Sequence, residues 1–223
     1  SEQAKGEYLS PLILDTAKRI SVPAAFHLDH GSGEPAVLRA LRNGASGIMI
    51  DASLKALEEN IAETGRIVSL CREIGVDVEG ELGHVGSAGD ESQSPFTEVA
   101  EAKRFVEETG VCALAVMIGT AHGKYKKAPT LQIERAREIS QTVGIPLVLH
   151  GGSGVPDDQV RAAIGAGVAK VNLGTDVCCS FLDSVFGVSR QIIALDLFMN
   201  EPIQAVKRFA MEKIRLLGAD GHV

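Results

Sequence analysis

The sequence has little that would place it in a membrane or on a nucleic acid. No apolar run approaches the roughly 20 residues that a membrane-spanning helix needs, and no signal peptide opens the chain. The net charge is −7 and no basic cluster offsets it, which argues against a nucleic-acid partner. The four cysteines form no Cys-x-x-Cys pair, so the usual zinc and redox spacings are absent. This pattern predicts reduced thiols in a cytoplasmic protein.

Two further absences narrow the choice of fold. No Gly-x-Gly-x-x-Gly segment follows the first expected strand, which disfavours an open sheet that binds a dinucleotide. No low-complexity linker divides the 223 residues, so we expect a single domain over 1–223.

Short apolar segments alternate with amphipathic segments along the chain. They predict strands at 23–29, 47–51, 76–82, 112–118, 146–150 and 169–173, and helices at 8–20, 34–43, 54–74, 98–109, 131–143 and 157–166, before a mostly helical tail. Apolar strands bounded by Gly or Pro are typical of a buried parallel sheet, and their alternation with helices predicts an α/β fold.

Polar residues at the ends of these strands favour a closed TIM (β/α)8 barrel over an open doubly wound sheet. In such barrels the active site lies at the carboxyl ends of the strands, and the loops after the last two strands often hold phosphate. Only six strands can be recognised, whereas a closed barrel needs eight. We therefore expect that the first two strands are missing from this sequence and that 1–223 is an N-terminally incomplete barrel domain.

Three histidines, His30, His122 and His150, each stand where an expected strand gives way to a loop. A single histidine in that position is more often a hydrogen-bonded core residue. Three of them, on strands whose ends meet at one mouth, indicate a metal site. Catalytic zinc sites usually have three protein ligands and an open position for water or substrate.

Carboxylates accompany these histidines. Asp29 directly precedes His30 and suits acid–base work on a substrate, although it could instead orient a histidine by a hydrogen bond. Asp51 and Glu81 also end strands. They are predicted either to form a second or alternative metal position or to belong to a hydrogen-bonded layer inside the barrel.

Glycine-bearing loops follow the last two strands. Gly151, Gly152 and Ser153 offer N–H groups and a hydroxyl to an anion, and helix 157–166 would add its N-terminal dipole. The run Asn172, Leu173, Gly174 and Thr175 offers the same chemistry. A metal beside a phosphate site suggests that a ketone is polarised and that an enediolate is stabilised when a carbon–carbon bond breaks. No strand lysine stands out for a Schiff base.

Six segments closely resemble, in order and spacing, the class II (zinc-dependent) fructose/tagatose-bisphosphate aldolases. They are HLDHG, MIDAS, VEGELGHVG, IGTAHGKYK, LVLHGGSGVP and KVNLGTD, and MEKIRLLGADG resembles the C-terminal helix of the family. The resemblance covers about residues 20–176 and implies a TIM barrel. It also implies reversible cleavage of a ketose 1,6-bisphosphate, through an enediolate on zinc, to dihydroxyacetone phosphate and glyceraldehyde 3-phosphate.

Matching positions imply roles for particular residues. His30, His122 and His150 correspond to the Zn2+ ligands, and Asp29 to the acid–base residue. Asp51 and Glu81 resemble the acidic residues of a second or displaced metal position. The contacts to phosphate and enediolate correspond to Gly123, Gly151–Ser153 and Asn172–Thr175, where the family often takes a monovalent cation, Na+ or K+.

The resemblance departs from the family at one loop. The family usually carries a proton-abstracting glutamate in a stretch like Gly-Gly-x-Glu-Asp, whereas this chain has GSAGDE. Asp90 or Glu91 is expected to substitute, unless loop residues are absent from this sequence. The resemblance also implies a homodimer or homotetramer.

Three alternatives stay open. The substrate could be another phosphorylated sugar or sugar acid, because residues outside these motifs contact the substrate tail. The altered loop is compatible with a non-catalytic, aldolase-like subunit. A metal-dependent hydrolase would share the metal, but the paired phosphate loops favour carbon–carbon chemistry.

Overall fold

The computed structural model describes residues 6–88 and 95–221, and within these ranges helices and strands alternate as predicted. The elements are α1 (Gly6–Arg19), β1 (His27–Gly31), α2 (Glu34–Arg42), β2 (Gly47–Ile50), α3 (Leu57–Arg72), β3 (Asp77–Leu82), α4 (Val99–Thr109), β4 (Ala113–Val116), α5 (Ile133–Val143), β5 (Leu147–Leu149), α6 (Asp157–Gly165), β6 (Val168–Val171), α7 (Thr175–Gly187) and α8 (Leu195–Leu216). The largest shift concerns the first strand, which was expected at 23–29. His27 therefore opens this strand rather than lying in its middle.

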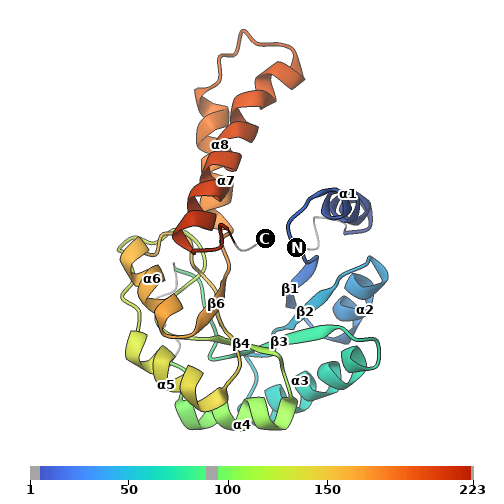
Figure 1. Ribbon diagram of the computed structural model, residues 1–223, viewed down its shortest axis with the longest axis vertical. Coiled ribbons are helices and arrows are strands. Elements are labelled where there is room, and N and C mark those ends of the chain that lie inside the picture. Colours follow the sequence, from blue (N-terminus) through green and yellow to red (C-terminus); the bar gives the residue numbers. More distant parts are fainter. Residues whose placement is uncertain (1–5, 89–94, 222–223) are drawn as a thin grey trace.

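The six strands form one parallel sheet whose order in space is their order in the sequence. Figure 1 shows this sheet curled, with α2 to α6 on its convex outer side. Helical crossovers between parallel neighbours produce this arrangement, because each helix returns the chain to the start of the next strand. β1 and β6 are the two edges, so the described residues form a partial barrel. The parallel α/β prediction is confirmed, whereas the described part of the chain does not show eight strands.

Alternation along the strands separates an apolar core from a polar interior. In β3, Val78 and Leu82 join the core beneath the outer helices. Successive side chains of a strand point to opposite faces, so Glu79 and Glu81 face the concave side. A small apolar cluster also lies on that side, and it consists of Met49, Ala115 and Val148. Met49 is the register partner of Glu79, and Ala115 that of Glu81, so apolar and charged side chains alternate across neighbouring strands on the concave side.

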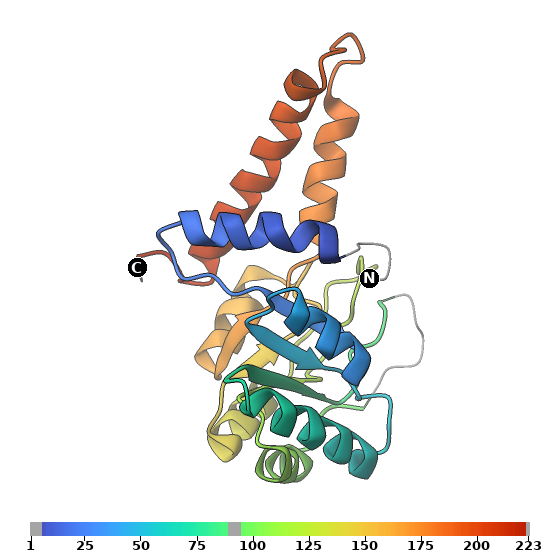
Figure 2. The same ribbon diagram turned by 90° about the vertical axis from the view of Figure 1, so that its right-hand side faces the viewer.

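The hairpin of α7 and α8 stands away from the sheet, as Figures 1 and 2 show. We call residues 175–216 the arm. Its two helices pack chiefly against each other and make sparse contact with the rest of the described chain. Figure 1 places α1 on the side of the edge strand β1 and the arm on the side of the other edge strand, β6. Among the helices that the structure describes, none is both long and apolar enough to cross a membrane.

Candidate active site

An irregularity in β1 brings two adjacent side chains, Asp29 and His30, to the same mouth. The register of β1 with β2 shifts between Leu28 and Gly31, and His30 has a φ of 47°. Within 6–88 and 95–221, His30 is the only non-glycine residue with a positive φ. This backbone region is costly for a residue with a Cβ, and such strain concentrates at functional sites. Neighbours that would point to opposite faces of a regular strand can therefore serve one site.

His30, His122 and His150 converge at the carboxyl ends of β1, β4 and β5. The ring centroid of His30 lies 5.0 Å from that of His122 and 4.7 Å from that of His150. The centroids of His122 and His150 are 5.9 Å apart. One ring nitrogen from each lies within 4.8 Å of the other two. The buried Nε2 of His122 has no hydrogen-bond partner among the described residues. Three imidazoles, one with an unsatisfied nitrogen, fit a divalent metal such as zinc.

Carboxylates fix the proton positions on two of these rings. Asp51 Oδ2 lies 2.8 Å from His30 Nδ1, and Glu79 Oε1 lies 2.9 Å from His150 Nε2. An ionised carboxylate only accepts, so both ring nitrogens donate. The other ring nitrogen of His150, Nδ1, lies 3.1 Å from His30 Nε2. The hydrogen bond to Asp51 raises the pKa of His30, although burial opposes the rise.

Asp51 is held as an anion by a small hydrogen-bond network. Its Oδ1 accepts from the backbone N–H of Ser53 at 3.1 Å and from the Ser53 hydroxyl at 2.7 Å. Burial favours the neutral acid, but hydrogen bonds from His30 and Ser53 outweigh it and hold the pKa of Asp51 well below its usual range. The Ser53 hydroxyl also lies 3.0 Å from His84 Nδ1. His84 thus supports the site indirectly.

Glu79 is a site residue that the sequence analysis did not single out. It is buried, and its Oε2 lies 2.9 Å from Lys170 Nζ and 3.4 Å from His27 Nε2. Burial opposes ionisation, but the hydrogen bond from His150, the nearby His27 ring and the Lys170 cation hold the pKa of Glu79 well below its usual range. The available signal was its position two residues before Glu81, which places both carboxylates on one face of the strand.

Glu81 is also buried, and the basic groups recorded near it are the rings of His84, whose Nδ1 lies 3.9 Å from Oε1, and His30, whose Nδ1 lies 4.0 Å from Oε2. Glu81 Oε1 accepts from the Val85 N–H at 3.1 Å, whereas its Oε2 has no hydrogen-bond partner in the described part of the chain. Burial and the nearby Asp51 carboxylate raise the pKa of Glu81 to about 7. Donor atoms of His30, Asp51 and Glu81 lie within 4.8 Å of one another. The predicted second or displaced metal position is compatible with this geometry.

Asp29 is exposed and is held in place by Asn172. The Asn172 Nδ2 donates to Asp29 Oδ1 at 2.9 Å, and its Oδ1 accepts from Lys170 Nζ at 2.7 Å. Because Lys170 can only donate, it determines which end of the amide faces Asp29. The same amide nitrogen lies 3.2 Å from His150 Nδ1. Asn172 therefore positions the exposed carboxylate beside the histidine cluster.

Two of the predicted glycine loops are joined to each other. A Cβ at Gly151, whose φ is 64°, would lie 2.4 Å from the Ala121 carbonyl oxygen. The Tyr125 hydroxyl accepts from the Ala121 N–H at 2.7 Å and donates to the Gly151 carbonyl at 2.9 Å. Gly123 lies between these contacts, and a Cβ there would meet nothing within 4 Å. Backbone groups near Gly123 thus border open space beside the histidines.

The run Asn172–Thr175 leads directly into α7. The Gly152 N–H donates to the Asn172 carbonyl at 3.1 Å, which joins this run to the Gly151–Ser153 loop. The N-cap residue of α7 makes no capping hydrogen bond through a side chain, but the Asp176 N–H in the first turn already donates to the Ser153 hydroxyl at 3.1 Å, and the Asp176 carboxylate adds a negative charge there. In the Gly151–Ser153 loop region, the Gly154 N–H donates to Asp176 Oδ2 at 2.8 Å, which also joins that loop to α7.

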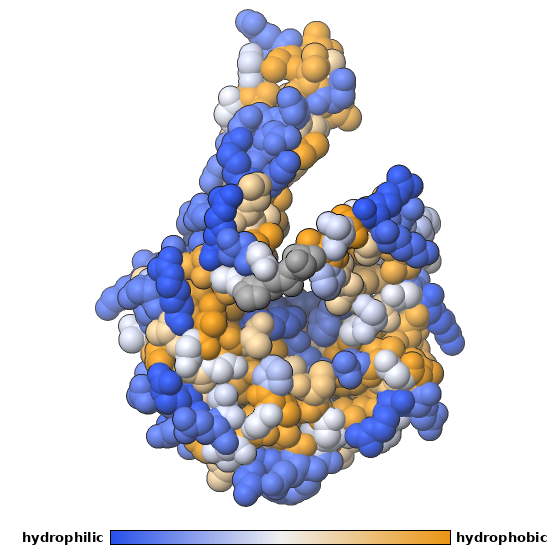
Figure 3. Space-filling view, in the orientation of Figure 1, coloured by the Kyte–Doolittle hydropathy of each residue, from blue (hydrophilic) through white to orange (hydrophobic). Residues whose placement is uncertain are grey.

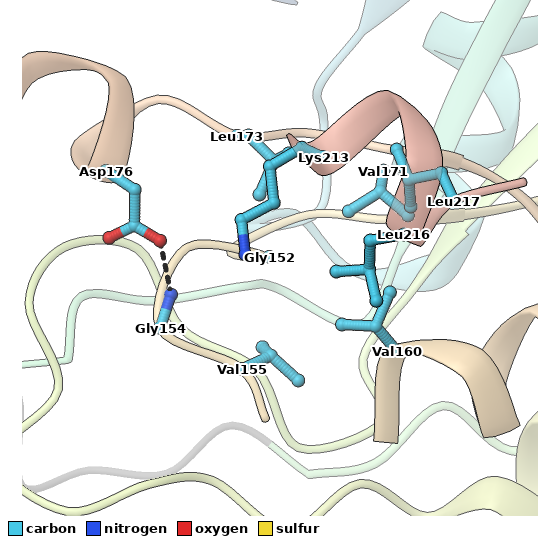
Figure 4. A pocket seen from close by; sticks show the side chains of 10 residues that line it. All are labelled: Gly152, Gly154, Val155, Val160, Val171, Leu173, Asp176, Lys213, Leu216 and Leu217. Atoms are coloured by element: carbon cyan, nitrogen blue, oxygen red, sulfur yellow. Dashed lines mark hydrogen bonds between the residues drawn. The ribbon is translucent and has the colours of Figure 1, made fainter. Parts of the chain in front are cut away.

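The surroundings of these loops differ from the sequence prediction in two ways. α6 begins with Asp157 and Asp158, whose negative charges disfavour the expected contribution of this helix to anion binding. Figure 4 shows Lys213 of α8 reaching toward the Gly152–Gly154 turn, across a cavity of about 130 Å³. The sequence analysis had not singled out this cation. The predicted loop base, Asp90 or Glu91, lies outside the described residues.

Comparisons with known proteins agree with this geometry. The model of the family described as "Fructose-bisphosphate aldolase class-II" matches residues 1–222. The 6-phospho-5-dehydro-2-deoxy-D-gluconate aldolase of Bacillus licheniformis is 38% identical over 207 residues, which are 91% of this chain and 71% of that protein.

Solved structures are similar over nearly the whole chain. The crystal structure of the YdjI aldolase from Escherichia coli K12 superposes with a TM-score of 0.88 at 35% identity, over 97% of this chain and 78% of that one. Fructose-bisphosphate aldolase from Campylobacter jejuni superposes with a TM-score of 0.79 at 21% identity, over 96% and 75% of the two chains. At 21% identity, the similarity to the Campylobacter jejuni structure shows a shared fold alone.

Proposed function

The chain belongs to the class II fructose-bisphosphate aldolase family, and from this premise we propose that it cleaves a ketose 1,6-bisphosphate of fructose or tagatose configuration. The products would be dihydroxyacetone phosphate and glyceraldehyde 3-phosphate, and the reaction would be reversible. The observation that carries the proposal is the meeting of three histidines, one exposed carboxylate and two joined glycine loops at a single mouth.

His30, His122 and His150 would hold a divalent cation, which we propose is zinc. Asp51 and Glu79 orient two of these rings, and such outer carboxylates typically strengthen metal affinity. When bound, the cation would supply Lewis-acid polarisation of the substrate carbonyl. Asp51 and Glu81 would offer an alternative position for the ion beside His30.

Asp29 is the proposed acid–base residue. In the cleavage direction, its carboxylate would accept the proton of the hydroxyl on the aldehyde side of the breaking bond, and in synthesis it would return that proton. The hydrogen bond from Asn172 holds it in place without neutralising it. Asp90 or Glu91 would move the second proton, on the dihydroxyacetone phosphate side.

The loops through Gly123, Gly151–Ser153 and Asn172–Thr175 would bind the substrate phosphate. Their backbone N–H groups supply donors without a full positive charge, and Lys213 lines the cavity beside Gly152 and Gly154. We propose that a monovalent cation, Na+ or K+, binds beside the same loops.

A second candidate substrate follows from the relatives. The Bacillus licheniformis protein is named for 6-phospho-5-dehydro-2-deoxy-D-gluconate, a phosphorylated sugar acid, and it is 38% identical to this chain. A sugar-acid substrate would use the same histidines and the same phosphate loops. It would differ only in the tail, which residues outside the shared motifs contact.

A coupled assay for dihydroxyacetone phosphate tests these proposals. Fructose 1,6-bisphosphate, tagatose 1,6-bisphosphate and 6-phospho-5-dehydro-2-deoxy-D-gluconate are supplied in turn, with EDTA and then with added zinc. Release that EDTA stops and zinc restores would support the metal-dependent aldolase, and the ratio of the three rates identifies the substrate. No release from any of the three, with metal bound, would refute the proposed activity and favour a non-catalytic subunit.

A further inference from the structure

A backbone irregularity in β6 turns the side chain of Lys170 into the concave side of the sheet. Leu147 of β5 is the register partner of Val168, but the next residue, Val148, is the register partner of Lys170. β6 thus contains an extra residue over this step, as in a β-bulge. Val168 belongs to the core beneath the outer helices, and Val148 belongs to the cluster on the concave side. Residues two apart in a regular strand face the same side, so the extra residue is what gives Val168 and Lys170 opposite faces.

On the concave side, where Figure 3 shows hydrophilic residues in the hollow between the arm and α1, the Lys170 ammonium contacts two groups that orient different parts of the site. Its Nζ lies 2.9 Å from Glu79 Oε2 and 2.7 Å from Asn172 Oδ1. Through its other oxygen, Oε1, Glu79 meets His150 Nε2 at 2.9 Å. The Asn172 amide nitrogen donates to Asp29 Oδ1 at 2.9 Å. An ammonium has three donors and no acceptor, so one lysine serves both oxygens at once.

We propose that Lys170 is a positioning residue for two proposed functional groups, the metal ligand His150 and the acid–base residue Asp29. This inference rests on the function proposed above. Its first branch runs through Glu79, whose carboxylate is buried, so the oxygen that does not face His150 needs a donor of its own. Lys170 supplies that donor at 2.9 Å, whereas the His27 ring nitrogen is 3.4 Å away. A carboxylate that is held at both oxygens keeps the His150 ring in one orientation.

The second branch runs through Asn172. The two ends of a carboxamide have nearly the same shape, so the amide turns over unless its hydrogen bonds favour one orientation. Because Lys170 only donates, it fixes the Asn172 oxygen on its own side and leaves the NH2 group for Asp29. Without the ammonium, the amide is free to present its oxygen to the Asp29 carboxylate, and two acceptors repel each other. Turnover should then fall although the metal ligands are unchanged.

Zinc titration by calorimetry and steady-state kinetics at saturating zinc measure the two branches separately. Lys170→Met should weaken zinc affinity about 10–100-fold, through the loosened Glu79. On whichever of the three substrates the wild type cleaves, it should also lower kcat about 10²-fold, which is the effect of a misplaced reacting group. Lys170→Arg keeps a cation with several donors, and the side chain is 36% exposed, so the longer arginine has room. This variant should retain most of both properties.

The matched control is Lys103→Met, which removes an exposed lysine from α4 on the convex side. It should bind zinc and turn over substrate like the wild type. Because Lys170→Met leaves the buried Glu79 carboxylate without its cation, the combined variant Glu79→Gln/Lys170→Met provides a protein that removes both charges together, which disturbs folding far less than removing one. Compared with Glu79→Gln alone, it should bind zinc equally well and still show a kcat about 10²-fold lower, because only the Asn172 branch is then lost.

Wild-type zinc affinity and kcat in Lys170→Met would overturn the proposal, and so would the loss of only one of the two. A loss of both that Lys170→Arg shares in full would also overturn it, because it would indicate a structural role alone. Equal kcat values for Glu79→Gln and the combined variant would exclude the Asn172 branch. A wild type that cleaves none of the three substrates would instead refute the proposed function, and the zinc titrations would still decide whether Lys170 acts on His150.

Discussion

Glu81→Gln should remove one contribution to the pH dependence of the free energy of unfolding in the metal-free protein. Glu81 is fully buried, and its Oε2 has no hydrogen-bond partner in the described residues. Burial and Asp51 raise its pKa from an ordinary 4.5 to about 7. A carboxyl whose pKa is higher in the folded state binds its proton more tightly there. Below about pH 4.5, Glu81 therefore does not lower the free energy of unfolding. Between about pH 4.5 and pH 7 it lowers this free energy increasingly as the pH rises.

The magnitude follows from this pKa difference. At 1.36 kcal/mol per pKa unit, ionised Glu81 lowers the free energy of unfolding by about 3 kcal/mol above pH 7. Glutamine has the same shape, keeps an oxygen for the Val85 N–H and has no charge to bury. Between about pH 5 and pH 8, the free energy of unfolding of the variant should therefore rise by about 2.5 kcal/mol relative to that of the wild type, because a small part of the cost is already present at pH 5.

Urea unfolding in EDTA at about pH 5 and pH 8 measures this difference. For each protein, the free energy of unfolding at low pH is subtracted from that at high pH, and the wild-type result is then subtracted from that of the variant. Contributions from titrating groups that the two proteins share cancel in this double difference. Glu73→Gln, at an exposed carboxylate after α3, is the control for the loss of one negative charge. Parallel stability curves for wild type and Glu81→Gln would refute the reasoning, because they would show that Glu81 does not bind its proton more tightly in the folded protein.

Four further substitutions test the remaining parts of the site. His122→Ala should abolish zinc binding, measured by calorimetry, and turnover together, because the Nε2 atom proposed as a ligand is lost; retained activity would exclude His122 as a ligand. Glu79→Gln should weaken metal affinity roughly 10–100-fold in the same titration, since a charged acceptor no longer orients His150; an unchanged affinity would contradict that role. Asp29→Asn should lower kcat about 10²–10⁴-fold while metal content stays at the wild-type level; a parallel loss of metal would instead make Asp29 a metal-binding residue. Gly151→Ala should cost about 1–3 kcal/mol in thermal unfolding, because the φ is positive and the new Cβ would press on a carbonyl oxygen.

Most of the fold could be predicted because apolar periodicity and Gly or Pro boundaries are local features. The strand at 146–150 is an example, since β5 lies within it at Leu147–Leu149. The first strand was predicted less well. Residues 23–26 have the composition of a strand, but the pairing that starts β1 at His27 depends on Gly47 of the neighbouring strand.

The candidate ligands could also be predicted from the sequence, because parallel strands bring their carboxyl ends to the same edge of a sheet. His30 lies near the end of β1, His150 directly follows β5, and His122 lies in the loop after β4. The same argument did not single out Glu79, since a carboxylate inside a strand is ambiguous until its neighbours are known. Its partners Lys170 and His150 come from β6 and the end of β5, far along the chain.

The sequence by itself determined which residue types end each strand, and hence that histidines, carboxylates and glycines would meet at one mouth. Only the tertiary structure decided how they are oriented there. The backbone shift at Asp29 and His30, the proton positions set by Asp51 and Glu79, and the raised pKa of Glu81 all depend on atoms that are distant in the chain. Local periodicity indicates which segments become strands and helices, whereas strand pairing, side-chain hydrogen bonding and burial depend on the packing of the whole chain.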